Sequence, residues 1–154
     1  MNKQKFLVFL LLLALAAALL SPTALAADEE EEATAYTRIT ISSAEEWMDF
    51  AKNCTLDAWS RDKEVVLTRD ISLSGWDYEP IPSFGGHFDG QGHTVSGVPI
   101  RSSAAPSGLF GETQESAEIR DLTVSASIAP SGDGSTVGGI VGKNRGLLSG
   151  CAFT

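Results

Sequence analysis

The sequence predicts a mainly β protein built as a stack of repeated coils, with one helix covering its amino-terminal end. One observation is a glycine-bracketed apolar pair, which occurs at Gly108–Gly111 and again at Gly139–Gly142. Another is a rung of apolar residues at x, x+3 and x+5, which begins at Val95, Ile119 and Leu148. These rungs recur at intervals of 24 and 29 residues. Such periods are typical of stacked repeats whose units cannot bury their apolar faces alone.

Residues 1–26 have the pattern of a secretory signal peptide. Lys3 and Lys5 are followed by an unbroken apolar run from Phe6 to Leu20, and Ala24-Leu25-Ala26 supplies a small-x-small cleavage pattern. A membrane anchor is the alternative, but an apolar run of 15 residues is shorter than the roughly 20 that span a bilayer. We therefore expect cleavage after Ala26, a secreted or cell-surface location, and no membrane span after cleavage.

The composition is strongly acidic. Loss of Lys3 and Lys5 with the leader would change the formal charge from -9 to -11. A chain of this charge is not expected to bind nucleic acid, because phosphate contacts require Lys and Arg. Residues 27–37 contain the run Asp28–Glu32, whose mutual repulsion predicts a flexible spacer. A calcium site in this run is conceivable, and the sequence leaves open whether calcium binds.

Residues 38–83 are expected to form a cap with one helix and short strands. Arg38–Ile41 alternates polar and apolar residues and predicts a strand. Ser43 and Glu46 have the spacing of a capping box, in which each side chain bonds the other residue's backbone amide. The apolar residues that follow lie on one helical face: Trp47, Phe50, Ala51 and Cys54. This face is expected to be buried against the first coil.

Two short strands, over 64–67 and 71–73, are predicted around the turn at 68–70. The composition then changes, because all 15 glycines fall at or after Gly75. We place the coiled region at residues 84–154. The last rung ends at Phe153 with nothing after it to cover its apolar side chains, so the chain alone is expected to be a truncated stack that self-associates.

The chain has two cysteines, Cys54 and Cys151, which is too few for a disulfide scaffold. A bond between them or a reactive thiol is one interpretation, and two small apolar packing residues is the other. The proposed geometry puts them at opposite ends of the stack, so we expect no bond. Asn53-Cys54-Thr55 matches a glycosylation acceptor pattern, but its place at a helix end favours a chance match.

Five polar or aromatic residues are the candidates for ligand contact: Trp76, Tyr78, His87, Asp89 and His93. Exposed Trp and Tyr side chains could form a platform on which a sugar stacks. Alternatively, Trp76 and Ile81 fold onto the end of the stack to shield it, which is the more common use of aromatic residues. The two histidines and Asp89 could in principle ligate a metal, but the glycines between them favour turn residues. We expect no catalytic residue, no cofactor and no metal.

Three segments carry a resemblance to a known family. Phe84–Val95 resembles the opening segment of secreted bacterial parallel β-helix proteins. Gly139–Cys151 resembles a GLUG repeat, with a glycine-bracketed apolar pair, an Asn-x-Gly turn and a strand ending near a cysteine. Gly108–Gly111 with Ile119–Val124 resembles the preceding, less regular coil. The resemblance runs from about Ile39 to the end.

This resemblance implies a right-handed parallel β-helix of the pectin-lyase-like architecture. Relatives include adhesin-like surface proteins and some IgA-cleaving metallopeptidases, in which the repeats lie outside the catalytic domain. No peptidase, pectate-lyase or polygalacturonase residue has a counterpart in this chain.

We therefore expect a non-catalytic module of an exported adhesin-like protein, acting as scaffold or stalk. Its partners would be a host or cell-wall glycan or protein, or further downstream coils of the same protein. The alternatives are a carbohydrate-binding or carbohydrate-active β-helix that uses the five candidates in one concave pocket, and a non-catalytic region of an IgA-peptidase-like protein.

Overall fold

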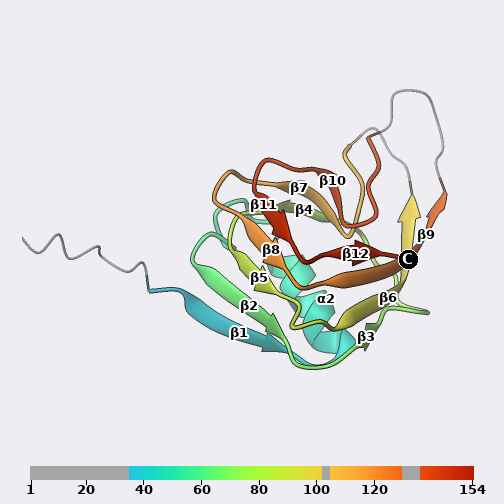
Figure 1. The fold of residues 1–154 in the computed structure, drawn as a ribbon, viewed down its shortest axis with the longest axis horizontal. Helices are drawn as coiled ribbons and strands as arrows, with labels where there is room; N and C mark the ends of the chain where they lie inside the picture. The colour runs from blue at the N-terminus through green and yellow to red at the C-terminus, as the bar shows by residue number, and fades with distance from the viewer. Residues whose placement is uncertain (1–34, 102–104, 130–135) are drawn as a thin grey trace, which may run out of the picture. The chain divides into compact units, whose positions relative to one another are not determined.

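The computed structural model describes residues 35–101, 105–129 and 136–154. The expected leader and most of the acidic spacer lie outside these ranges. The described residues form parallel strands in three sheets together with one helix (Figure 1). No helix in the described ranges has the length and apolar character needed to cross a bilayer.

The three sheets are numbered here in the order in which the chain first enters them. Sheet 1 consists of β1 (Thr37–Ile41), β2 (Lys63–Leu67), β5 (His87–Asp89), β8 (Glu118–Arg120) and β11 (Leu147–Ser149). Sheet 2 consists of β3 (Ile71–Ser72), β6 (Thr94–Arg101), β9 (Thr123–Ala129) and β12 (Ala152–Phe153). Sheet 3 consists of β4 (Ile81–Phe84), β7 (Phe110–Thr113) and β10 (Val141–Lys143).

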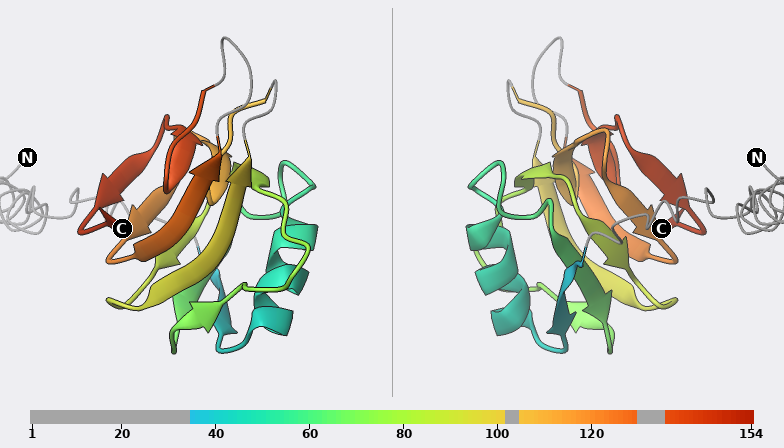
Figure 2. Two further views of the ribbon diagram at one scale, coloured as in Figure 1. Left: turned by 90° about the vertical axis from the view of Figure 1, so that its right-hand side faces the viewer. Right: turned by 90° about the vertical axis from the view of Figure 1, so that its left-hand side faces the viewer.

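The chain visits the three sheets in turn, so each visit to all three completes one coil. The strands β2, β3 and β4 form the first coil, β5 to β7 the second, β8 to β10 the third, and β11 and β12 begin a fourth. Each strand pairs in parallel with the strand of the same sheet in the next coil, as Figures 1 and 2 show. The predicted fold class is confirmed: the described residues form a parallel β-solenoid of about four turns with one short helix.

The register of the strands confirms one predicted alignment and corrects another. Ile119 lies opposite Leu148 in sheet 1, as the repeat predicts. The alignment of Val95 with Ile119 is wrong, because Val95 lies in sheet 2 opposite Val124. The corner before Val95 contains two additional residues in a tight turn, Gln91 and Gly92, with φ angles of 49° and 78°. They make the interval from Phe88 to Ile119 two residues longer than the interval from Ile119 to Leu148, and Phe88 is the residue that lies opposite Ile119.

A bulge in β6 shifts the register further along the same strand. Ser96 pairs with Ser125, whereas Val98 pairs with Ala126, so Gly97 has no residue opposite it. Gly97 has a φ of 71°, and a Cβ at this position would collide with Ser74. Only glycine fits both the backbone angle and the close approach.

The coiled region begins earlier than the boundary predicted at residue 84. The two strands expected around the turn at 68–70 are present as β2 and β3, but they do not pair with each other. β2 pairs with β1 and β5, while β3 pairs with β6. Residues 63–84 therefore already form a complete coil.

Helix α2 (Ala44–Asn53) begins at a cap that differs in one detail from the predicted capping box. The Ser43 hydroxyl accepts a hydrogen bond from the Glu46 amide at 3.2 Å, as expected. The Glu46 carboxylate accepts from the Ser42 amide at 2.6 Å and the Ser42 hydroxyl at 2.9 Å, one residue before the predicted donor. Both bonds lower the pKa of Glu46, and the bond from the Ser42 amide has the larger effect. The reciprocal cap is thus wider by one residue.

The apolar face of α2 is buried, as predicted. Trp47 and Phe50 are 0% and 3% exposed. Both rings have edge or tilted contacts with phenylalanines of the first two coils: Phe84, Phe88 and Phe110. Figure 2 shows α2 at the end of the stack opposite the last coil. The helix therefore shields the apolar interior that would otherwise be open at the amino-terminal end.

Both cysteines are free thiols, in agreement with the expectation that they do not bond. Cys54 follows the last turn of α2 and is fully buried, and this burial raises its pKa to about 12. Cys151 is partly buried in the last coil, where its Sγ lies 3.6 Å from the Ile119 carbonyl oxygen. Their positions fit the interpretation as small apolar packing residues.

The last coil leaves one edge of each sheet without a neighbouring strand in the described part of the chain. The edge strands are β10, β11 and β12. Leu147 and Phe153 are 58% and 45% exposed there. The two ends of the solenoid therefore differ: α2 covers one, and the other presents apolar side chains beside open backbone edges.

Candidate binding groove

The loop between β3 and β4 is held firmly against the second coil. Its backbone turns at Gly75, which has a φ of 83°, and the Trp76 amide donates to the Leu73 carbonyl at 3.1 Å. Tyr78 is buried, and its hydroxyl donates to the Leu109 carbonyl at 2.5 Å. This burial raises the pKa of Tyr78 above its ordinary value. The buried tyrosine thus anchors the loop.

The same loop forms one wall of a hollow of about 420 Å³. Trp76 lies in this wall and is 37% exposed. The remaining lining residues come from the loop, from β4 and β6, and from the segment before β7: Asp77, Tyr78, Glu79, Pro80, Pro82, Pro99, Ala105, Pro106 and Ser107. The expectation that Trp76 and Ile81 shield the stack holds for Ile81, which is fully buried, but not for the partly exposed indole.

A second hollow of about 500 Å³ lies between the loop and helix α2. Its helix-side residues are Met48, Asp49, Ala51, Lys52 and Thr55. Four residues line both hollows: Asp77, Glu79, Pro80 and Pro82. The two hollows therefore adjoin, and we refer to them together as the loop groove.

The loop groove is acidic. Asp77 and Glu79 are exposed, and neither has a hydrogen bond or ion pair among the described residues. By contrast, Asp89 pairs with Arg120 at 2.8 Å and Glu112 with Arg145 at 2.9 Å. Two unpaired carboxylates beside an indole can attract a cation or accept hydrogen bonds from hydroxyl groups.

The other three candidates of the sequence lie outside this groove. His87 is on β5, where its ring lies 4.2 Å from that of Tyr36. Asp89 also belongs to β5 and accepts from the Gln91 amide at 2.9 Å, in addition to its ion pair. These residues stabilise sheet 1 and its corner. The five candidates do not share one pocket, because only Trp76 and Tyr78 line the loop groove.

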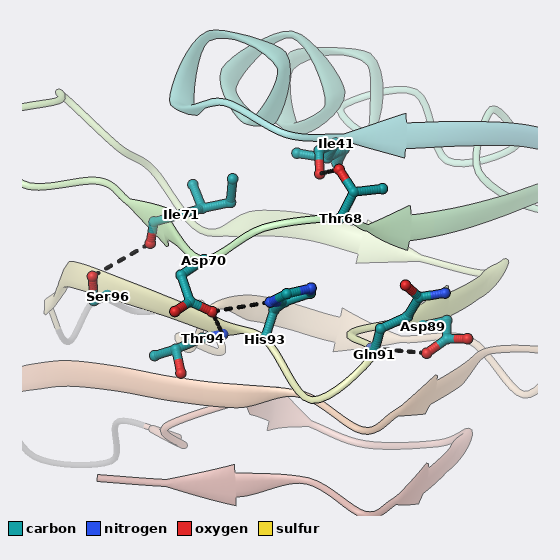
Figure 3. A network of polar contacts seen from close by, with 9 residues as sticks. All are labelled: Ile41, Thr68, Asp70, Ile71, Asp89, Gln91, His93, Thr94 and Ser96. Atoms are coloured by element: carbon teal, nitrogen blue, oxygen red, sulfur yellow. Dashed lines mark hydrogen bonds and ion pairs between the residues drawn. The ribbon is translucent and has the colours of Figure 1, made fainter.

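His93 takes part in a polar network at the corner between sheets 1 and 2 (Figure 3). Its Nδ1 lies 3.1 Å from Asp70 Oδ1, which also accepts from the Thr94 amide at 2.9 Å. The hydrogen bond from the Thr94 amide lowers the pKa of Asp70, and the contact with His93 lowers it further. The pair links the corners of two successive coils. Within the described ranges, no group of three His, Cys, Asp or Glu residues is arranged to hold a metal ion.

Sequence reasoning missed Asp77 and Glu79 as groove residues. A local signal existed, because both flank Tyr78 in the aromatic loop that the sequence singles out. The opposite walls had no such signal. Met48 and Pro106 reach the groove from a helix and a later coil, and only the coiled fold brings them near the loop.

No family model matches the chain, and no solved structure matches it. Halomucin of Haloquadratum walsbyi is 30% identical to the chain over 108 residues. The matched part is 64% of this chain and 1% of halomucin. The chain thus spans only a very small part of that relative's length. The GLUG and pectin-lyase-like features remain a resemblance, and the structure supports them at the level of a parallel β-solenoid.

Proposed function

We propose that this chain is a non-catalytic scaffold or stalk module of an exported, surface-associated protein. The observation that carries the proposal is the asymmetric solenoid. Helix α2 covers one end with Trp47 and Phe50, while β10, β11 and β12 have an unpaired edge at the other end among the described residues. A stack of this kind extends by adding coils of the same design, without a change in the coils already formed.

Three further features support this function. The sequence pattern of residues 1–26 is that of an export signal, and the acidic charge favours solubility outside the cell. The similarity to halomucin, a protein named as a mucin, favours a role at the cell exterior. The dispersal of His87, Asp89 and His93 away from the loop groove fits side chains that serve the fold.

Fractionation of the source cells tests the location. We expect the protein in the exterior or surface fraction, with an intact mass that corresponds to an amino terminus at Ala27. Retention of Phe6–Leu20 in the mature protein, or recovery from the cytosol, would contradict export.

A second experiment tests the scaffold role. Combined alanine replacement of His87 and His93 should lower the amount of surface protein only slightly, through loss of their exposed contacts with Tyr36 and Asp70. Phe50→Ala should lower it much more, because it damages the buried, capped end. Hydrolysis or elimination of a polysaccharide by the purified protein, lost in the His87/His93 variant, would instead establish the carbohydrate-active alternative.

A further inference from the structure

We infer that the loop groove binds a lysine- or arginine-bearing segment of a partner polypeptide. Its indole, Trp76, and its two unpaired carboxylates, Asp77 and Glu79, together provide the surroundings that a protein uses to hold an organic cation. This inference goes beyond the scaffold role, because it assigns a ligand class to a surface that the scaffold does not require.

The same chain already contains a cation held in this way. The Lys63 ammonium lies 5.4 Å from the centroid of the Trp59 ring and 2.6 Å from Asp62 Oδ1. Trp59 and Asp62 thus supply an aromatic face and a carboxylate to one ammonium group. The loop groove offers the same two chemical groups, Trp76 and its flanking carboxylates, and among the described residues no cation lies within ion-pair distance of Asp77 or Glu79.

The loop is prearranged for binding. The buried hydroxyl of Tyr78 fixes the centre of the loop to Leu109, and Pro80 and Pro82 restrict the backbone that follows. Asp77 and Glu79 flank this anchor. A ligand therefore meets carboxylates whose backbone is already ordered, which lowers the entropy lost on binding.

The size and charge of the groove favour a polypeptide over a small amine. The two adjoining hollows, of about 420 and 500 Å³, share four lining residues, and each is larger than one ammonium group. Three carboxylates line the groove (Asp49, Asp77 and Glu79) against one ammonium, that of Lys52. An extended segment with more than one basic side chain matches both the length and the excess negative charge.

The test measures binding of a fluorescently labelled hexalysine peptide to the folded protein, with fully Nε-acetylated hexalysine as the uncharged comparison. We expect the acetylated peptide to bind at least about tenfold more weakly. Replacement of both carboxylates, Asp77→Asn with Glu79→Gln, should weaken hexalysine binding by about tenfold. This is the change in affinity expected from the loss of two modest surface ion pairs. Trp76→Ala should weaken it by about threefold to tenfold, and Trp76→Phe by less.

A charge-matched control separates this site from general attraction to an acidic protein. Asp57→Asn with Glu115→Gln removes the same net charge at exposed positions outside the loop groove. It should leave the affinity within about twofold of the unsubstituted protein. Equal losses from both double variants, with circular dichroism confirming that each is folded, would overturn the proposal. So would binding of neutral methyl glycosides that depends on Trp76 when hexalysine does not bind.

Discussion

Single residues at the corners of the coils determine how tightly the chain can turn from sheet 1 into sheet 2. Asp121 has a φ of 50° and Gly150, at the same corner one coil later, has a φ of 60°. A Cβ on Gly150 would contact the Asp121 carboxylate. This corner therefore has a left-handed backbone angle in two successive coils, and only in the second of them is the residue a glycine.

Replacing the aspartate with glycine should stabilise the fold. We expect Asp121→Gly to raise the free energy of unfolding by about 0.5–1 kcal/mol, because glycine adopts a positive φ without steric cost. Gly150→Ala should lower it by about 1–3 kcal/mol through the strained angle and the contact with Asp121. Urea denaturation of both variants checks the pair, and a loss of stability in Asp121→Gly would contradict the argument.

The buried aromatic residues of α2 are expected to contribute strongly to the stability of the fold. Phe50 is 3% exposed and contacts Phe84 and Phe88. Phe50→Ala should lower the free energy of unfolding by about 3–5 kcal/mol. Lys52→Ala, at an exposed position of the same helix, should change it by less than about 0.5 kcal/mol. Similar small effects from both would mean that the helix covers nothing.

The carboxylate of Asp70 predicts one pH effect. Its pKa is lower in the folded chain than the ordinary value of ~3.9, so it stabilises the fold above that pH. This contribution disappears as the pH falls through the folded-state pKa. Asp70→Asn should therefore be less stable than the unsubstituted protein at pH 7, and the difference should shrink below about pH 4. A difference that is constant across this range would show that the charge of Asp70 contributes nothing.

At the scale of elements, the helix and the coils differ in how far the sequence determines them. The face of α2 is predicted correctly because its residues lie within one local period, from Trp47 to Cys54. The match of Ile119 with Leu148 is also predicted, since the corner between β8 and β9 has the same length as the next one. Val95 is misplaced because its spacing to Val98 and Ile100 arises within strand β6, at the bulge of Gly97, whereas the same spacing from Ile119 spans a corner.

The amino-terminal cap of α2 is the element-level feature most open to a direct test. Ser43→Ala removes the acceptor for the Glu46 amide and should lower the free energy of unfolding by about 1 kcal/mol. Ser43→Asp keeps an acceptor at that position and should retain most of the stability. Thermal unfolding followed by circular dichroism compares the three proteins. Equal losses in both variants would show that the hydroxyl does not act as a cap.

At the scale of the whole stack, the described residues combine a capped end with an open one, and this asymmetry predicts self-association of the chain in isolation. Exposed Leu147 and Phe153 lie beside unpaired strand edges. The chain spanning residues 27–154 should therefore form concentration-dependent oligomers in light scattering. Leu147→Lys with Phe153→Lys should reduce association strongly. Leu56→Lys, at a residue 65% exposed elsewhere, should not. A monomer at all concentrations would contradict the prediction.

The parallel register also determines how much length the stack gains for each residue added. Residues that face each other in successive coils are about 30 positions apart, as in Phe88 with Ile119 and Ile119 with Leu148. Each coil advances the stack by only ~4.8 Å, whereas the same residues fully extended would span roughly 100 Å. A tenfold longer reach therefore needs a tenfold longer chain. A long stalk of this architecture therefore has to be encoded by a very long gene.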